Sequence, residues 1–394
     1  MKYNLSDICD YAKGKIDVNL LDENTYISTE NMLPNKSGIT RASSLPSIAQ
    51  TQAFLAGDVL VSNIRPYFKK IWFAGYDGGC SNDVLVFRAK EGVSKRFLYY
   101  VLANDTFFDY SMVTSKGTKM PRGDKTAIMK YEVPSFTYEE QETIAGILES
   151  LDRKIQINTE INDNLSQQSD LIFYNMFGQY YKESIIPPNW TLTELGNIDV
   201  LITDYVANGS FKSLADNVQY LDTETNNVLI RLTDFNNNFD GDMVYISDDS
   251  YEFLSKSMLY GDEIIISNVG ANVGTVFRCP RLSKRMSLGP NAVLLRSKKY
   301  EHYLYLLFKS SYGQGLLQSI VTGSAQPKFN KTNFRALKIL VPDDKTLSIF
   351  NETYAPMFEK ITVNNIENNR LSKTRDTLLP KLMSGELDIS NIDI

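Results

Sequence analysis

An internal repeat with a period of about half the chain is the feature that most constrains the fold of this protein. The recurring features are VTSKGTKMP at 113–121 and VTGSAQP at 321–327, the steps Val133–Pro134 and Val341–Pro342, and the heptad runs 144–176 and 350–382. Val113 and Val321, like Pro134 and Pro342, are 208 residues apart, whereas the heptad runs are offset by 206. A two-copy chain presents two similar surfaces, and this geometry suits an elongated, quasi-two-fold ligand such as duplex DNA.

Composition indicates a soluble globular protein with about two cores. The chain has 394 residues, of which 43% are hydrophobic and 22% are charged. It has no run of about 18 apolar residues, and residues 1–7 lack the layout of a signal peptide, so we expect a cytoplasmic protein without a membrane segment. Cys9, Cys80 and Cys279 are far apart and show no CxxC spacing. The sequence therefore predicts reduced, half-buried thiols, with neither a disulfide framework nor a zinc site.

Positive charge is concentrated in two short segments, although the formal net charge is −6. Residues 114–130 carry five cations and one acid, and residues 322–338 carry four cations and no acid. Smaller basic clusters occur at 65–70 and 278–285, while acids gather in the first heptad run. Any one such segment is compatible with an ordinary solvated loop. Recurrence in both copies favours a local DNA-binding face, because Lys and Arg displace counterions from phosphates.

The pattern predicts an α+β fold in which two mixed α/β globular domains in tandem are joined by two long helices that pair as an antiparallel coiled coil. Short apolar runs at 58–62, 72–74 and 83–88 predict strands, and 94–112 has helical spacing. The expected parts are a first domain at 1–137, a helix at 138–182, a second domain at 188–342, a helix at 343–386 and an exposed tail at 387–394. The segment 207–251 has no evident counterpart in 19–54.

The two heptad runs predict the helix pairing. The predicted seam consists of Ile144, Leu148, Leu151, Ile155, Asn158, Asn162 and Leu165 in the first run, and Phe350, Met357, Ile361, Asn364, Asn368 and Leu371 in the second. Asparagines on an apolar seam weaken a coiled coil but fix its register. About 34 helical residues span about 50 Å, so an antiparallel pair would separate the domains by a fixed distance. Alternatively, each helix packs on its own domain, or the seams drive homodimerisation. Pro380 is expected to break or end the second helix.

Three groups of motifs carry a family resemblance. They are TGSAQPKFNK at 322–331 leading to ILVP at 339–342, LLPKLMSGEL at 378–387, and RPYFKK at 65–70 with SNDVLVF at 81–87. In this order, with two domains each followed by a long helix, they resemble the specificity subunit of type I restriction-modification systems, over essentially the whole chain. The first copy departs from the pattern at 114–121 and at 173–177.

The resemblance implies a division of labour. Each globular domain would be a target recognition domain that reads one half of a split, asymmetric target in double-stranded DNA, and the helices would set the unread gap. Two methyltransferase subunits would dock on the chain and bring S-adenosylmethionine, with or without a motor-nuclease subunit, and the chain itself would catalyse nothing. The nearer alternative is a specificity subunit of a type IIB-like system, which cuts on both sides of its site. The more distant one is a two-domain coiled-coil scaffold that does not bind DNA.

The sequence offers no catalytic constellation, in agreement with a recognition subunit. The sequence has no Asn-Pro-Pro-aromatic motif, no Walker A motif and no Gly-rich loop that opens a helix. Gly270–Gly274 is expected to be a turn, and Asp152–Lys154 is expected to lie on a solvated helix face rather than in a nuclease site. His302 is the only histidine, so no histidine-based triad or metal site is predicted.

Phosphate contacts require Lys or Arg, and base edges in the major groove are read by Arg, Asn or Gln. The predicted DNA-contacting residues are Arg65, Lys69, Lys70, Lys119, Arg122 and Lys125 in the first domain, and Gln326, Lys328, Asn330 and Lys331 in the second.

Overall fold

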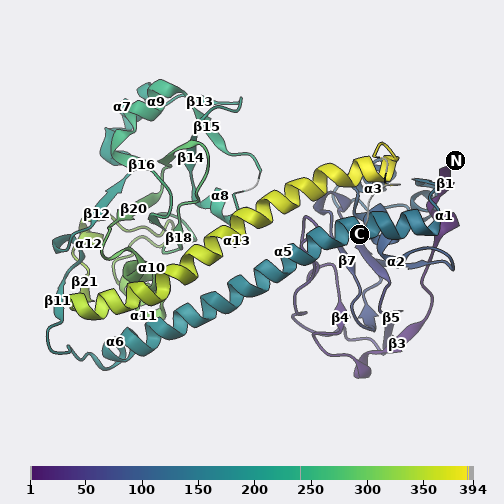
Figure 1. Cartoon of the computed structure of the whole chain (residues 1–394), viewed down its shortest axis with the longest axis horizontal. Helices are drawn as coiled ribbons and strands as arrows, with labels where there is room; N and C mark the ends of the chain where they lie inside the picture. The colour runs from purple at the N-terminus through teal and green to yellow at the C-terminus, as the bar shows by residue number, and fades with distance from the viewer. Residues whose placement is uncertain (1, 240, 388, 390–394) are drawn as a thin grey trace. The chain divides into compact units, whose positions relative to one another are not determined.

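The computed structural model describes residues 2–239, 241–387 and 389, and the chain divides into two compact units. Unit 1 comprises residues 1–160 and 364–394, and unit 2 comprises residues 161–363. Two long helices, α5 (Tyr138–Phe173) and α13 (Asp344–Ser384), each contribute residues to both units. Figure 1 labels the helices and strands of both units.

Unit 1 is built on two four-stranded sheets. Its strands are β1 (Lys2–Asn4), β2 (Cys9–Tyr11), β3 (Lys15–Asp17), β4 (Tyr26–Ile27), β5 (Gln50–Phe54), β6 (Val59–Ser62), β7 (Ile71–Phe73), β8 (Gly78–Cys80), β9 (Val84–Ala89) and β10 (Glu132–Pro134). Its shorter helices are α1 (Leu5–Ile8), α2 (Lys95–Ala103), α3 (Asp105–Val113) and α4 (Lys125–Ile128). The sheet orders are β2-β9-β6-β7 and β3-β5-β8-β4, with β4 and β8 parallel, and β1 pairs separately with β10.

The first sheet of unit 1 is buried on both faces. In β6, Val59 and Val61 face the core shared with α2 and α3, whereas Leu60 faces the core shared with the second sheet. This alternation explains why the sequence shows a continuous apolar run at these strands. The strands predicted at 58–62, 72–74 and 83–88 are confirmed as β6, β7 and β9. The predicted helix 94–112 is divided at Asn104, whose backbone is extended and whose side chain accepts a hydrogen bond from Thr106 N–H at the start of α3.

Unit 2 repeats the first sheet with the same order of equivalent strands. Its strands are β11 (Thr191–Glu194), β12 (Leu201–Asp204), β13 (Tyr220–Leu221), β14 (Asn227–Ile230), β15 (Val244–Ile246), β16 (Met258–Leu259), β17 (Ile264–Ser267), β18 (Val276–Arg278), β19 (Arg285–Leu288), β20 (Ala292–Arg296) and β21 (Lys338–Val341). Its shorter helices are α6 (Gln179–Glu183), α7 (Phe211–Asn217), α8 (Leu232–Asn236), α9 (Asp248–Phe253), α10 (Glu301–Lys309), α11 (Ser311–Ser319) and α12 (Lys331–Arg335). The order β12-β20-β17-β18 corresponds to β2-β9-β6-β7.

The second sheet of unit 2 is larger, with the order β13-β15-β14-β19-β16. Its parallel pair, β14 and β19, corresponds to the parallel pair β4 and β8 of unit 1. The expectation that 207–251 has no counterpart is therefore wrong for β14, which takes the same sheet position as β4. The added elements are α7, α8, α9, β13 and β15. Residues of α7, α9 and β15 form a small separate core with Leu229 of β14, whereas α8 packs on another core through Leu232 and Phe235.

A single offset of 206 residues relates the two units from α2 onward. The first residues of the paired helices are Lys95 and Glu301, Asp105 and Ser311, Lys125 and Lys331, and Tyr138 and Asp344, and each pair is 206 apart. The offset of 208, which aligned Val113 with Val321 and Pro134 with Pro342, is therefore wrong for the structure. It arose because the matching Val-Thr dipeptides at 113–114 and 321–322 are not at structurally equivalent positions but two residues apart.

The long helices pair side by side within each unit. In unit 1, Arg375 Nη1 lies 2.8 Å from Asp152 Oδ1, and Asn158 Nδ2 donates to Asn368 Oδ1 at 2.9 Å. Residue numbers rise along α5 as they fall along α13, so the pair is antiparallel. In unit 2, the ring of Phe350 packs on Phe173 with 6.3 Å between centroids. The predicted fold class, two mixed α/β units with antiparallel long helices, is confirmed.

The predicted seam residues are all buried or half-buried. Ile144 and Leu148 lie in the core of unit 1, and Phe350 lies in the core of unit 2, so these positions pack on the domains. Asn158, near the middle of α5, instead bonds to the other helix, with Nδ2 2.8 Å from Glu367 Oε2 as well as close to Asn368. The seam thus combines the predicted pairing of the two helices with the alternative in which each helix packs on a domain.

The first long helix agrees with the prediction of 138–182, because α5 continues without a break through a π-helical turn (Tyr174–Gly178) into α6, which ends at Glu183. The end of the second long helix differs from expectation. The prediction that Pro380 breaks or ends the second helix is wrong, because α13 continues to Ser384. Leu379, Leu382 and Met383 are buried in the core of unit 1, and burial at about 2 kcal/mol per side chain offsets the roughly 3 kcal/mol that an interior proline costs.

The expected exposed tail begins at residue 387. Leu387 and Ile389 pack against the core of unit 1, so the expectation is wrong for these two residues, and residues 388 and 390–394 lie outside the described part of the chain. None of the helices that the structure describes has the length and apolar character needed to cross a bilayer. The three cysteines form no disulfide, as predicted, but they are fully buried rather than half-buried.

Candidate nucleic-acid interface

In unit 1, the basic residues lie on two loops that pair with each other. The first loop, residues 63–70, follows β6, and the second, residues 114–124, precedes α4. Arg65 N–H donates to Pro121 O at 2.8 Å, and Arg122 forms isolated β-bridges with Ile64 and with Lys116. Arg65 and Arg122, which are far apart in sequence, are therefore held on neighbouring backbone segments.

Unit 2 contains the same pair of loops. The first, residues 268–274, follows β17, and the second, residues 320–330, precedes α12. Gly270 N–H donates to Pro327 O at 2.9 Å, and Lys328 forms isolated β-bridges with Val269 and with Thr322. The sequence GANVG at 270–274 lies in a turn of this loop, as predicted.

These contacts show which predicted residues of the two units occupy equivalent positions. Arg122 corresponds to Lys328 and Lys125 to Lys331, both at an offset of 206. In this register GTKMPR at 117–122 aligns with GSAQPK at 323–328. Both glycines have left-handed backbones, with φ of 93° for Gly117 and 89° for Gly323, a conformation that favours glycine. The departure of the first copy at 114–121 is therefore a difference of register, and the two loops share one design.

Polar contacts restrain two of the predicted cations in unit 1, Lys69 and Lys70. Lys69 Nζ lies 3.0 Å from Asp105 Oδ2, and Lys36 Nζ lies 2.7 Å from Asp105 Oδ1. Burial opposes ionisation of Asp105, but these two ammonium groups hold its pKa below the ordinary value. Lys70 Nζ donates to Thr29 O at 2.6 Å, and burial lowers the pKa of its ammonium group. Lys69 and Lys70 thus also organise their own loop.

The remaining cations of unit 1 are more accessible. Arg122 is exposed and lies 3.1 Å from Asp83, an exposed contact that solvent weakens. Lys119 and Lys125 are exposed, and neither forms an ion pair with any residue that the structure describes. Lys125 begins α4, whose N-cap is Asp124. Lys119, Arg122 and Lys125 therefore offer the positive charge of this surface.

In unit 2 the predicted residues divide into two groups. Gln326 and Lys328 are exposed, and within the described residues no carboxylate pairs with Lys328. Asn330 caps α12 by accepting from Asn333 N–H at 2.7 Å, and Lys331 Nζ lies 2.8 Å from the buried Asp204. The side chains of Asn330 and Lys331 therefore have structural partners. Those of Gln326 and Lys328 form no hydrogen bond or ion pair within the described residues.

One repeated polar feature was not singled out by the sequence. Asn63 follows β6, and Asn268 follows β17. The backbone carbonyl of Asn63 accepts from Gly123 N–H at 3.2 Å and that of Asn268 from Phe329 N–H at 3.1 Å, and these bonds join the two loops of each unit. The Oδ1 atoms of both residues are buried without a partner among the described residues, as is Arg65 Nε. The echo of Ser62-Asn63 in Ser267-Asn268 was the sequence signal for this position.

Two further expectations concern residues away from the loops. His302 packs its ring 5.0 Å from Tyr354, and its Nδ1 lies 3.0 Å from Arg278 Nη2, a structural role as predicted. Asp152 was expected on a solvated helix face, and this is wrong: it is half-buried and accepts from Tyr100 Oη at 2.8 Å as well as from Arg375. The three-residue sequence pattern gave no sign of these distant partners.

Comparison with known proteins gives consistent results. The family model described as type I restriction modification DNA specificity domain matches twice, over residues 1–167 and 191–373. The HindI specificity subunit of Haemophilus influenzae is 23% identical, covering 98% of this chain and 99% of that protein. The MjaIX specificity subunit of Methanocaldococcus jannaschii is 27% identical over 77% of this chain and 71% of its own length.

The fold is also similar to a solved structure. The crystal structure of a type I restriction-modification system S subunit from M. genitalium matches with a TM-score of 0.61 and 14% identity, covering 97% of this chain and 96% of that one. At this identity the match concerns the fold alone.

Proposed function

Because this chain belongs to the family of type I restriction-modification DNA specificity subunits, we propose that its two units read the two halves of one split DNA target. Each unit would present its pair of basic loops to the duplex. Lys and Arg side chains would hold the phosphates, and exposed polar groups such as Gln326 would read base edges.

The observation that carries this proposal is the recurrence of one loop geometry in both units. Arg122 and Lys328 each sit at the centre of three paired backbone segments, and each is exposed. A solvated loop without a function has no physical reason to keep a cation at the same bridged position in two units whose other elements differ. Two similar binding surfaces on one chain match a target with two separate halves.

The long helices would act as the spacer between the half-sites. They pair within each unit through the contacts of Asp152 with Arg375 and of Phe173 with Phe350. At about 1.5 Å per residue, the 36 residues of α5 extend about 54 Å, which exceeds the roughly 34 Å of one DNA turn. The length of these helices would then set the number of unread base pairs.

The chemistry would be supplied by partners in the cytoplasm. Two methyltransferase subunits, carrying S-adenosylmethionine, would dock on this chain, with or without a motor-nuclease subunit. The chain itself would contribute recognition without catalysis. The family to which it belongs supports assembly with other subunits of such a system.

Methylome sequencing of a host that carries this chain and its methyltransferase partner tests the proposal. The expected result is methylation at one asymmetric sequence composed of two defined halves and an undefined gap. Exchanging unit 2 for that of a related chain should change one half only. Methylation that is unaffected by deletion of this chain would contradict the proposal.

A further inference from the structure

Unit 2 contains a pocket of about 510 Å³ beside its basic loops. One wall comes from β12, the turn after it and α7, and the other from residues 268–269 and 290–292. Because α7 has no counterpart in unit 1, the pocket joins the shared scaffold to the part that is specific to unit 2. Its volume lies within the range of small-molecule sites.

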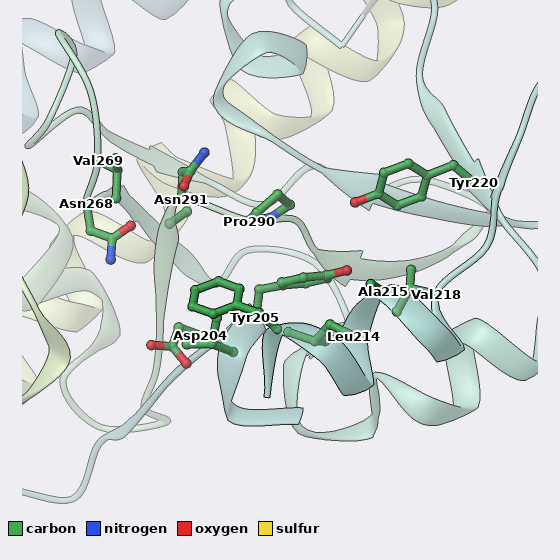
Figure 2. Close-up of a pocket in the computed structure, with 13 residues that line it drawn as sticks. Asp204, Tyr205, Leu214, Ala215, Val218, Tyr220, Asn268, Val269, Pro290 and Asn291 are labelled. Carbon is green, nitrogen blue, oxygen red and sulfur yellow. The ribbon is translucent and has the colours of Figure 1, made fainter. Parts of the chain in front are cut away.

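The walls of the pocket suit a flat, uncharged group. Figure 2 shows Tyr205 and Pro290 facing each other across the space, with Leu214, Ala215 and Val218 continuing the apolar wall. Phe211 and Tyr220 also line it, and they are 84% and 57% exposed, so the pocket is open to solvent. Aromatic side chains that remain this exposed next to a cavity provide surfaces on which a planar ring can stack.

One end of the pocket is polar and rich in acceptors. Asp204, Asn268 and Asn291 gather there in Figure 2. The bonds to Asp204 from Ala207 N–H and Lys331 both end on its Oδ1 atom, which leaves Oδ2 as an acceptor at this end of the pocket. A ligand that brings a hydrogen-bond donor here would be favoured, because a carboxylate oxygen forms strong charge-assisted hydrogen bonds.

The same end adjoins the positive charge of the candidate interface. Val269 lines the pocket and is bridged to Lys328, while Asp204 lines it and is paired with Lys331. If a ring with an attached anionic group bound here, the anionic group would lie next to Lys328 and Lys331. The ring itself would occupy a pocket whose lining contains no cation.

We propose that this pocket receives one nucleobase turned out of the DNA stack at the half-site read by unit 2, and that this base carries an exocyclic amino group. Adenine and cytosine have such a group, which would donate to the Asp204 carboxylate. The ring would stack between Tyr205 and Pro290 near Phe211, and the flanking phosphate would lie by Lys328. This inference rests on the proposed function and adds a site that reads an unpaired base, distinct from the groove contacts of the loops.

The test uses the full chain assembled with its methyltransferase partners and duplexes of the mapped target. Each adenine of the second half-site is replaced in turn by 2-aminopurine, whose amino group is at C2 instead of C6, and each cytosine by pyrrolocytosine. Both analogues keep an N–H donor on the ring edge, and both fluoresce more strongly when they no longer stack on neighbouring bases. Methyltransferases turn out the base that they modify, so 2-aminopurine at an adenine that the methylome shows to be methylated serves as an internal positive signal. The expected result is a further emission increase at one position that is not methylated.

The decisive variant is Phe211→Ala, which removes an exposed ring and leaves the described cores intact. We expect it to abolish the additional emission and to weaken binding of the target roughly tenfold, while the methylated adenine still emits. Tyr260→Ala is the matched control, because Tyr260 is an aromatic residue of unit 2 that is 70% exposed and lies outside the pocket lining. It should leave the additional emission unchanged.

Each other outcome has a definite meaning. Specific binding with emission only from the methylated adenines would overturn the pocket assignment and leave the proposed function standing. Failure of the complex to bind the mapped sequence would overturn both. Titration with free adenosine and cytidine distinguishes the source of the base: saturable binding that Phe211→Ala abolishes, without additional emission from DNA, would assign the pocket to a free nucleoside and overturn the DNA assignment.

Discussion

At the scale of single residues, the cations of the two units differ in how free they are to meet a phosphate. Lys328 has no carboxylate partner in the described chain, whereas Lys331 is 2.8 Å from Asp204 and Lys69 is 3.0 Å from Asp105. A paired lysine must give up an existing contact to bind DNA, so its net contribution is smaller. The predicted contact residues are therefore unequal, although their charges are the same.

We expect Lys328→Ala to weaken DNA binding by the assembled complex and to reduce the slope of log K against log salt by about 0.9, the value for one lost phosphate contact. Arg122→Ala and Lys331→Ala should have smaller effects, because both side chains are already paired with a carboxylate. Binding titrations at several salt concentrations provide the measurement. Lys256→Ala, an exposed lysine elsewhere in unit 2, is the matched control. An unchanged slope in Lys328→Ala would remove this residue from the interface.

His302 should make the stability of the protein depend on pH. Burial and, after it, Arg278 lower its pKa from 6.5 to about 4. Between these values the unfolded chain binds a proton that the folded chain does not, so the free energy of unfolding should decrease as the pH falls from 6.5 towards 4. Urea unfolding at pH 7 and pH 5 should show a smaller difference for His302→Gln than for the natural chain. Equal differences for the two proteins would contradict the assignment.

Some residue-level features could be predicted from the sequence and others could not. The basic character of the loops is local, so it was evident from 114–130 and 322–338. The partners of Lys69 and Lys331 are Asp105 and Asp204, which lie far along the chain and reach these lysines only through the fold. The pocket residues Phe211 and Tyr220 were missed for the same reason, because nothing near them in sequence indicates a cavity.

At the scale of elements, periodic segments were the easiest to predict. The long helices were identified because their heptads repeat over many turns, and β6 and β9 because both faces are buried. The loop register was misread by two residues because GTKMPR and GSAQPK share only a glycine, a proline, a hydroxyl residue and a final cation. The β-bridges of Arg122 and Lys328, together with the equivalent starts of α4 and α12, establish the alignment. Pro380 was misjudged because tertiary packing outweighs its local preference.

The polar position in the helix pair of unit 1 should limit stability and fix register. Asn158 donates to Asn368 and Glu367, and its own Oδ1 is buried without a partner in the described residues. Replacing Asn158 and Asn368 together by leucine should raise the free energy of unfolding by about 1–4 kcal/mol, because an imperfect buried polar cluster becomes apolar. Asn158→Ala alone should lower it. Urea unfolding of the full chain provides the measurement, and a less stable double-leucine variant would contradict the argument.

At the scale of the whole molecule, the spacer hypothesis makes a quantitative prediction. Inserting seven helical residues into both α5 and α13, at 160/161 and 363/364 where the units divide, adds about 10 Å to each helix. With about 3.4 Å per base pair, the unread gap should grow by about three base pairs while both half-sequences stay the same. Methylome sequencing would show this directly.

Insertion into α5 alone is the control for the spacer prediction. It displaces the seam of one helix relative to the other, so methylation should be lost rather than redirected to a wider site. A gap that is unaltered after insertion into both helices would contradict the spacer hypothesis.

Unit 1 is completed by residues from the far end of the chain. Leu379, Leu382 and Met383 of α13 are part of its core, together with Leu5 and Val59. During synthesis, the amino-terminal part of unit 1 would therefore expose an apolar surface until residues 379–383 have left the ribosome. A chain that stops before these residues would keep that surface exposed, which would favour its recognition by chaperones and proteases.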